Sequence, residues 1–364
     1  MKRILLNLVF TILTINGISF SQKYSGDIKP FSLDFLSVYE GRMLNDSTKF
    51  SEFTNSIWIN YFFNKDTKVA LTSRYASVGG DLNSLNGLSD TQMLLNHSFA
   101  EQNIGIEGGI NIPSGKTKLT DDEFLTSRII SQNIFAMNTS NFGQGLNAFL
   151  GFTWTNPVSE QVVLGAGLSY QLKSEYQPLE NISDKYSPSN EISVSGGLDI
   201  KLTEVSTLTG DITGIFYGSD ELNGEKVFTA GNRFIFNTLY KHHLGYDALS
   251  VNLLYRLMSV DKIEGASEIL DDEKVNPNQL YAALSYFQRI NSGFSINYSA
   301  FMSLYEETIS YYSGYTMFGV MLTPEFRISP QIRIPVILRF STASADDKPT
   351  FTNFDIGSGI KINF

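Results

Sequence analysis

The sequence predicts an all-β fold, a closed antiparallel transmembrane β-barrel of about 16 strands, with 14 strands as the alternative. Three observations predict it: a half-apolar strand at the C-terminus, segments in which apolar and polar residues alternate, and connections that alternate between short and long. A closed barrel pairs all of its backbone groups, so its strands can cross lipid. We expect short periplasmic turns and long extracellular loops.

The N-terminus has the three parts of a secretory signal peptide. Lys2 and Arg3 precede an apolar run over 4–15, which a Ser-Phe-Ser cleavage site follows. The run is too short to anchor the chain in a bilayer as a helix. We therefore expect a signal peptide over residues 1–21 and a single barrel domain over residues 22–364.

Composition narrows the function classes. The net charge of −10 becomes −12 without the two basic residues of the signal peptide, which argues against nucleic acid as a partner. Because cysteine is absent, disulfides, thiolate nucleophiles, Cys-based metal sites and a lipid-anchored N-terminus are excluded. Mean hydropathy lies near zero, as expected when lipid-facing and water-facing side chains alternate.

The chain after the signal peptide divides into sixteen strand-like segments, most of them long enough to cross the hydrocarbon layer. The predicted segments are 30–43, 51–63, 67–77, 87–99, 103–113, 141–155, 160–173, 188–202, 206–219, 227–241, 247–260, 277–289, 292–306, 311–327, 331–342 and 351–364.

The connections alternate in length. Short links follow the even-numbered segments, whereas most odd-numbered segments precede longer links, namely 78–86, 114–140, 174–187, 261–276 and 343–350. This parity is typical of outer-membrane barrels.

Acidic runs such as 121–123 and 271–273 lie in the long links, either as ordinary solvated loops or as a rim that divalent cations bridge to lipopolysaccharide. Aromatic residues near both strand ends predict two interfacial girdles.

Charged residues fall on the polar phase of the predicted strands. If the apolar phase faces lipid, these residues line the lumen, since an arginine facing lipid at mid-depth costs about 2–4 kcal/mol. They serve either in ion pairs that hold the wall together or in solute passage. The lumen-lining candidates are Arg74, Glu107, Asp199, Asp211, Arg233, Arg256, Arg333 and Arg339.

The longest link, 114–140, has apolar content that a disordered loop would lack. It either folds into the lumen or over the mouth as a constriction, or it hides one more hairpin. The sequence leaves both alternatives open.

The C-terminal segment is similar to the signal that the bacterial barrel-assembly machinery reads. Gly359, Ile362 and Phe364 occupy the corresponding positions, and Gly357 stands where that signal tends to carry a polar residue. The similarity implies the barrel-assembly machinery as a partner.

Motifs for catalysis or cofactors are absent from the sequence. The run Gly109–Thr117 resembles a phosphate-binding loop, but its two glycines are separated by five residues where four are required. His97, His242 and His243 are too dispersed to form a metal site, and His97 is poorly placed for a nucleophile–base pair. We therefore expect neither enzymatic activity nor a cofactor.

Three short motifs resemble the outer-membrane proteins grouped under the meta-pathway of phenol degradation. They are Gly87–Gln92 at a strand start, Gly109–Lys116 at the end of the next strand, and Phe142–Asn147 at the following strand opening. Ser114 replaces a threonine of that family's turn. The resemblance covers roughly residues 87–170 and implies a transport-type barrel, distantly like the long-chain fatty-acid and aromatic-hydrocarbon transporters. The composition resembles that of Bacteroidetes proteins.

These features together predict a channel in the bacterial outer membrane for passive uptake of small, apolar or aromatic molecules. A structural or surface-binding barrel with a plugged lumen is the main alternative, and a membrane-embedded hydrolase is a weaker one. The expected partners are outer-membrane lipid and lipopolysaccharide, the assembly machinery and a small-molecule solute.

Overall fold

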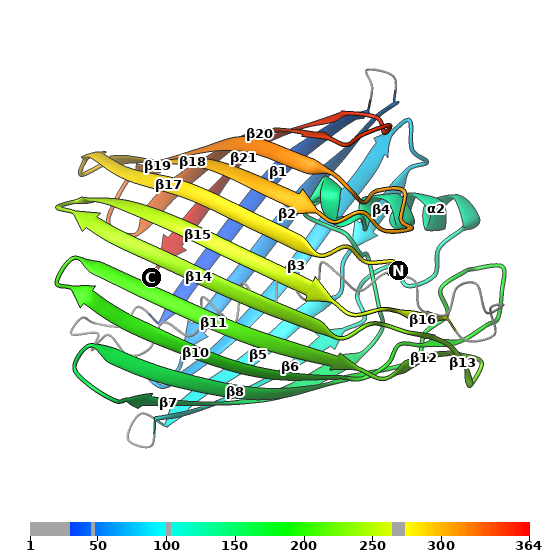
Figure 1. Cartoon of the computed structure of the whole chain (residues 1–364), viewed down its shortest axis with the longest axis horizontal. Helices are drawn as coiled ribbons and strands as arrows, with labels where there is room; N and C mark the ends of the chain where they lie inside the picture. Colours follow the sequence, from blue (N-terminus) through cyan, green and yellow to red (C-terminus); the bar gives the residue numbers. More distant parts are fainter. Residues whose placement is uncertain (1–29, 45–47, 100–102, 264–273) are drawn as a thin grey trace.

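The computed structural model describes residues 30–44, 48–99, 103–263 and 274–364. Within these residues the chain forms a closed antiparallel β-barrel of 16 strands, as the sequence predicts (Figure 1). The predicted signal peptide, the turn at 100–102 and the acidic run at 271–273 lie outside the described residues.

Long, tilted strands form the barrel wall, in which the short β4 (Leu85–Leu88) continues the line of β5 beside β3. The wall strands are β1 (Phe31–Leu44), β2 (Thr48–Phe62), β3 (Thr67–Gly80), β5 (Thr91–Phe99), β6 (Ile104–Ile112), β7 (Asn147–Pro157), β8 (Val162–Lys173), β10 (Glu191–Thr203), β11 (Ser206–Tyr217), β14 (Arg233–Leu244), β15 (Asp247–Met258), β17 (Gln279–Asn291), β18 (Phe294–Tyr305), β19 (Thr316–Arg327), β20 (Ile332–Ser344) and β21 (Phe351–Asn363).

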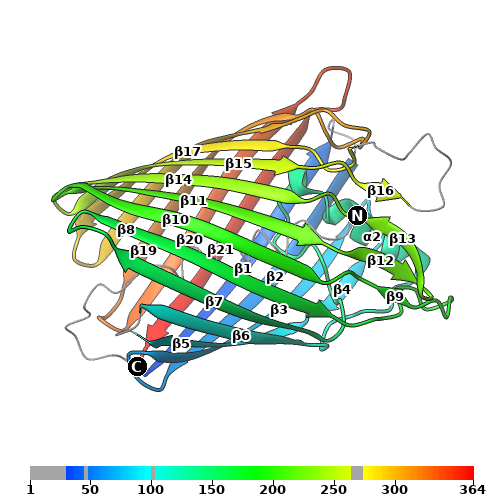
Figure 2. The same ribbon diagram turned by 60° about the horizontal axis from the view of Figure 1, so that its bottom comes forward.

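The barrel closes between its first and last strands. β1 pairs antiparallel with both β2 and β21, in a register that sets Ser32 opposite Asn363 and Leu44 opposite Phe351. The backbone N–H of Phe364 donates to the carbonyl of Phe31 at 2.9 Å, and their ring centroids lie 5.5 Å apart. Both views show a continuous wall without an open sheet edge (Figures 1 and 2). The terminal aromatic residue therefore completes the seam.

Three predicted strands begin five or six residues too early, namely those at 141, 227 and 311. Residues 225–229 do form a strand, but it belongs to a second sheet at the long-loop end, which the sequence analysis missed. Local alternation cannot distinguish a wall strand from a strand beyond the rim, because both have the same period. That second sheet consists of β9 (Tyr186–Ser187), β12 (Ser219–Leu222), β13 (Glu225–Thr229) and β16 (Lys262–Ile263).

The two ends of the barrel differ as the connection lengths predict. The links after β2, β7, β10, β14, β17 and β19 are short, and we call that end the short-turn end. The second sheet and the two helical segments, α2 (Asp121–Ile130) and η1 (Asn133–Phe135), lie at the opposite, long-loop end (Figure 1). No helix among the described residues is long and apolar enough to cross a membrane.

The outer surface of the wall is apolar. Large apolar side chains are exposed at alternate positions of the strands, for example Leu168, Tyr170 and Leu172 on β8 and Phe318, Val320 and Leu322 on β19. The residues between them face the interior. Since burial of an apolar belt in lipid requires this alternation, the outer surface fits a bilayer.

Candidate functional site: the lumen and its inward segment

Residues 113–146, the inward segment, run from β6 to β7 and pack against the inner surface of the wall at the long-loop end. The segment contains α2 and η1 and no hairpin. The alternative of a hidden hairpin is therefore wrong, and the apolar residues of the segment form a core with the wall. Its buried members include Leu119, Ile130, Ile134, Phe135, Met137 and Phe142.

A capping box starts α2. The Glu123 N–H donates to Thr120 Oγ1 at 3.3 Å, and the Thr120 N–H donates to Glu123 Oε2 at 3.1 Å. Lys116 also forms an ion pair with Glu123. Partial burial acts to raise the pKa of Glu123, but the bonds from Lys116 and Thr120 outweigh it, so the pKa lies below its usual value. The carboxylate thus holds the start of the helix in its charged form.

Phe135 anchors the segment in the core. Its side chain is fully buried, and its ring centroid lies 5.2 Å from that of Phe50, 5.3 Å from that of Phe351 and 5.1 Å from that of Tyr312. The neighbouring Ala136 has a left-handed backbone (φ 48°), which ends η1 and turns the chain along the wall. The anchor therefore joins the inward segment to β2 and β21, the strands on either side of β1.

Wall charges hold the backbone of the segment next to this anchor. Arg42 Nε donates to the Phe135 carbonyl at 2.7 Å, while its other nitrogens pair with Asp355 at 2.6 Å and Glu40 at 3.1 Å. The barrel seam explains this grouping, because the β1–β21 register sets Glu40 directly opposite Asp355. Arg339 forms a second ion pair with Asp355. The four charged residues Glu40, Arg42, Arg339 and Asp355 are called the seam cluster below.

Two further backbone groups of the segment bind acidic wall residues. The Asn138 N–H donates to Glu40 Oε2 at 2.9 Å, and the Thr139 N–H donates to Glu52 Oε1 at 2.7 Å. Arg74 donates to the Asn138 carbonyl. The bond from the Arg74 guanidinium is charge-assisted, and such bonds are stronger than those between neutral groups. The segment is therefore fixed to one side of the lumen through its main chain.

Asp90 binds both ends of the inward segment, which we call its stems. Its Oδ1 accepts the Gly115 N–H at 3.0 Å and its Oδ2 accepts the Gln144 N–H at 2.7 Å. Gly115 is needed for this contact, since a Cβ there would stand 1.9 Å from the Phe142 carbonyl oxygen. The three motifs that resemble a transport family thus meet at one carboxylate. Burial raises the pKa of Asp90, against the effect of these hydrogen bonds.

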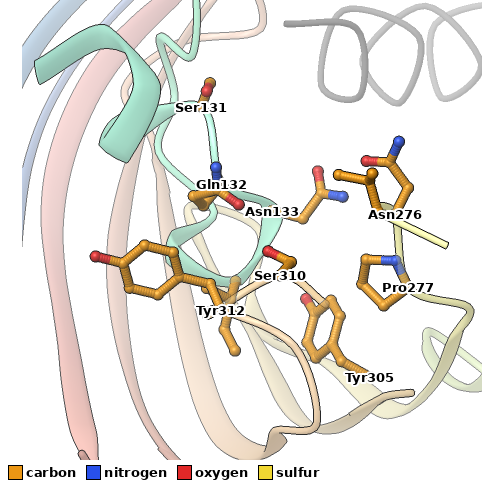
Figure 3. Close-up of a pocket in the computed structure, with 10 residues that line it drawn as sticks. Ser131, Gln132, Asn133, Asn276, Pro277, Tyr305, Ser310 and Tyr312 are labelled. Atoms are coloured by element: carbon orange, nitrogen blue, oxygen red, sulfur yellow. The ribbon is translucent and has the colours of Figure 1, made fainter. Parts of the chain in front are cut away.

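A pocket lies between the inward segment and the long loops (Figure 3). It is lined by polar, aromatic and aliphatic side chains from three connections and by Tyr305 at the end of β18. The lining residues are Ser131, Gln132, Asn133 and Ile134 of the inward segment, Val275, Asn276 and Pro277 before β17, and Tyr305, Ser310 and Tyr312.

The eight lumen-lining candidates all occupy the strand phase opposite to the exposed apolar residues. The structure brings only Arg74 and Arg339 to the inward segment. Asp199 accepts a hydrogen bond from Thr209 at 2.6 Å, and Arg333 lies 3.6 Å from Glu325 near the short-turn end. Arg233 and Arg256 adjoin each other elsewhere on the wall. Asp211 stands opposite Asn237, and Glu107 stands opposite Asn96. A role for them in solute passage stays a prediction.

Sequence reasoning missed the members Glu40, Arg42 and Asp355 of the seam cluster. A signal was available, because a closed barrel pairs its first strand with its last and both carry charges on the polar phase. The contacts to Phe135 and Asn138 had no such signal, since they join residues about a hundred positions apart.

The histidines lie at the short-turn end. His97 packs on Phe99 of the apolar phase and its Nδ1 lies 2.8 Å from Thr67 Oγ1. The Nδ1 atom of His242 lies 2.7 Å from Ser206 Oγ, a pair that the sequence analysis did not identify. Among the described residues, no hydrogen bond links that imidazole to the carboxylate or amide that a nucleophile–base pair requires. The described residues also hold no cluster of His, Asp and Glu able to bind a metal ion.

Comparison with known proteins leaves the family open. No family model matches the sequence, and no curated protein matches it. Among solved structures, CdiB from Acinetobacter baumannii has a TM-score of 0.54 and 10% identity, with 91% of this chain and 60% of that chain covered. At this identity the similarity concerns the fold alone.

Two other solved structures match over most of their own length, and one of them is described as a channel. OpdQ from Pseudomonas aeruginosa has a TM-score of 0.48 and 10% identity, with coverage of 91% of this chain and 98% of that chain. The CymD monoaromatic hydrocarbon channel has a TM-score of 0.48 and 9% identity, with coverage of 93% and 89%.

Proposed function

We propose that this protein is an outer-membrane channel for the passive uptake of small solutes, with apolar or aromatic molecules as the substrate class. Solutes enter at the long-loop end, pass beside the inward segment, and leave at the short-turn end. The long-loop end then faces the cell exterior and the apolar outer surface faces lipid.

The size of the barrel carries this proposal. Eight-stranded barrels are filled by their own side chains, whereas barrels of 16–18 strands leave an aqueous channel. This wall has sixteen strands and presents charged and amide side chains on its inner phase. Such a lumen is too wide for the wall residues alone to close, and its polar lining favours water.

The inward segment narrows the channel from one side. Its hydrogen bonds run to β1, β2, β3 and β20, and the buried core that it joins also includes residues of β18, β19 and β21. The opposite strands, β10 to β15, make no hydrogen bond to the segment in the described part of the chain. Solute therefore passes between the segment and that wall, where the side chains of both set the size limit.

Liposome swelling tests the proposal. The refolded full chain, reconstituted in liposomes, is exposed to neutral sugars of increasing size and to benzyl alcohol. We expect swelling that falls with sugar size, because a narrowed pore excludes large solutes. Swelling equal to that of protein-free liposomes, from protein shown to be folded by its heat-dependent gel mobility, would contradict the proposal.

A surface-binding barrel is the second candidate, favoured by the second sheet. β9, β12, β13 and β16 project beyond the rim at the long-loop end, and Figure 2 shows them away from the wall. Among the described residues the edge strand β16 pairs only with β13, so its other side offers backbone groups to an extended peptide. Binding of an external partner without solute flux would support this function instead.

A further inference from the structure

Arg233 and Arg256 are two buried cations without an anionic partner in the part of the chain that the structure describes. Each residue is 2% exposed, and the Nε atom of each is buried without a hydrogen-bond partner. Arg42 is buried to the same degree, yet it bonds to Glu40 and Asp355. Because burial of an unpaired charge is unfavourable, the two arginines call for an anion that the described chain does not supply.

The β-ladder sets the two arginines side by side. Arg233 begins β14 and stands opposite Met258 of β15, while Arg256 of β15 stands opposite Ile235. The two are therefore diagonal neighbours on one face of the sheet, with backbones roughly 7–8 Å apart. The exposed Tyr255 and Phe236, which stand opposite each other in the row next to Arg256, belong to the lipid-facing phase, so both guanidinium groups are on the inner side.

Aromatic and aliphatic side chains surround the pair. The guanidinium carbon of Arg233 lies 5.7 Å from the centroid of the Tyr217 ring, and Ile215 stands opposite Arg233 on β11. The ionisable groups that act on Arg256 are Arg233, Tyr305 and Tyr217, none of them a carboxyl group. These surroundings suit a ligand with one anionic group and an apolar body.

Tyr305 connects the arginines with the pocket in Figure 3. Gln279 stands opposite Arg256 in the β15–β17 register, and its Nε2 donates to Tyr305 Oη at 3.1 Å. The same tyrosine lines the pocket, between the inward segment and the long loops. A solute that enters at the long-loop end therefore reaches the arginine pair next to Tyr305.

We propose that Arg233 and Arg256 bind the carboxylate of an aromatic organic anion, an inference that rests on the proposed channel function and names its substrate class. A planar guanidinium matches a carboxylate in two parallel hydrogen bonds, and two of them offset its charge in surroundings with little water. Tyr217, Tyr305 and Ile215 contact the aromatic body. The seam cluster, whose charges are paired, keeps the inward segment in place and takes no part in this binding.

Titration calorimetry on the full chain in detergent tests the assignment with benzoate as the probe. We expect benzoate to bind, and both benzyl alcohol and inorganic phosphate to bind at least about tenfold more weakly, the first for lack of charge and the second for lack of an apolar body. Replacement of both arginines (R233Q/R256Q) abolishes binding, while R333Q leaves it unchanged, because Arg333 lies elsewhere on the wall. Binding retained in the double variant, or phosphate binding as tight as benzoate, would overturn the assignment.

Thermal unfolding gives a second readout that does not depend on binding by the variant. Since the arginines lack partners in the described structure, R233M/R256M raises the Tm of the ligand-free protein, and benzoate raises the Tm of the wild type only. A fall in the Tm of the ligand-free variant by several degrees would show a structural ion pair and overturn the inference.

The two proposals fail separately. Solute flux in liposomes with no benzoate binding in detergent would overturn the anion site and leave the channel standing. Benzoate binding with no flux of any solute would instead overturn the channel on which the substrate assignment rests.

Discussion

The Nε atom of Arg42 donates a 2.7 Å hydrogen bond to the carbonyl oxygen of Phe135, ninety-three positions along the chain. Arg42 belongs to the first strand of the barrel, and Phe135 belongs to the segment inside it. The same guanidinium binds Asp355 of the last strand. One side chain therefore links the closure of the barrel to the position of the inward segment.

Arg42→Ala is expected to lower the free energy of unfolding by about 3–5 kcal/mol, because the buried Glu40 keeps only a 3.9 Å contact with Arg339 and Asp355 loses one of its two cations. Urea unfolding in lipid vesicles measures the change. Arg333→Ala is the matched control, since its ion pair with Glu325 is longer and half-exposed. We expect that control to change the free energy by less than about 1 kcal/mol. Equal effects of the two variants would contradict the role given to the seam cluster.

Asp90→Ala is expected to loosen both stems of the inward segment. The N–H groups of Gly115 and Gln144 lose their acceptor, and each partly buried donor left unpaired costs about 1–3 kcal/mol. Hydrogen exchange at these two amides should accelerate by tenfold or more, about 1.4 kcal/mol.

Asp121→Ala serves as the control for Asp90, because Asp121 bonds only the exposed Asn181 side chain among the described residues. We expect slow exchange at residues 115 and 144 in that variant. Slow exchange in Asp90→Ala as well would show that the stems do not depend on the carboxylate.

The start of α2 is expected to weaken in acid. The pKa of Glu123 is lowered in the folded protein. The stabilisation that its carboxylate gives to the start of α2 is therefore fully present above the ordinary pKa of 4.5 and is lost as the pH falls through the folded-state pKa. Hydrogen exchange over 121–130, measured against pH, should show protection that declines below about pH 4.5. Glu123→Gln should remove most of this pH dependence, and a wild type without the decline would refute the assignment.

The sequence specifies the wall better than it specifies the interior. The segment 160–173 alternates cleanly, and β8 occupies 162–173. Such patterns are local, because a lipid-facing side chain at every second position is required wherever the strand sits in the barrel. The predicted strand bounds were wrong where a strand lies outside the wall, as at 225–229.

Contacts of the interior depend on closure and on distant residues. Glu40 and Asp355 become neighbours only when the first strand pairs with the last, and Phe135 meets Phe50 only when the inward segment folds against them. Alternation placed Arg233 and Arg256 on the polar phase, but the ladder register was needed to show that they adjoin. The apolar content of 114–140 predicted a packed segment and could not choose between a hairpin and a helix.

Gly359→Ala is expected to impair barrel closure. A Cβ at Gly359 would stand 2.2 Å from the Phe35 carbonyl oxygen, so the β1–β21 seam would have to shift. Gly210→Ala is the control, because the nearest atom to its Cβ would be a Leu198 side-chain carbon at 3.9 Å. We expect a lower yield of heat-modifiable, folded protein for Gly359→Ala alone. Unimpaired folding of that variant would contradict both a tight seam and a part for Gly359 in the assembly signal.

Single-channel recording in planar lipid bilayers tests the central claim, a water-filled lumen narrowed by the inward segment. Phe135→Ala is compared with the wild type, since loss of this buried ring costs the segment about 3–5 kcal/mol of packing while the wall stays intact. Leu125→Ala, an exposed change on α2, is the control. We predict current steps for the wild type, larger or noisier steps for Phe135→Ala, and unchanged steps for Leu125→Ala. Folded protein that gives no current steps in either the wild type or Phe135→Ala would contradict the account.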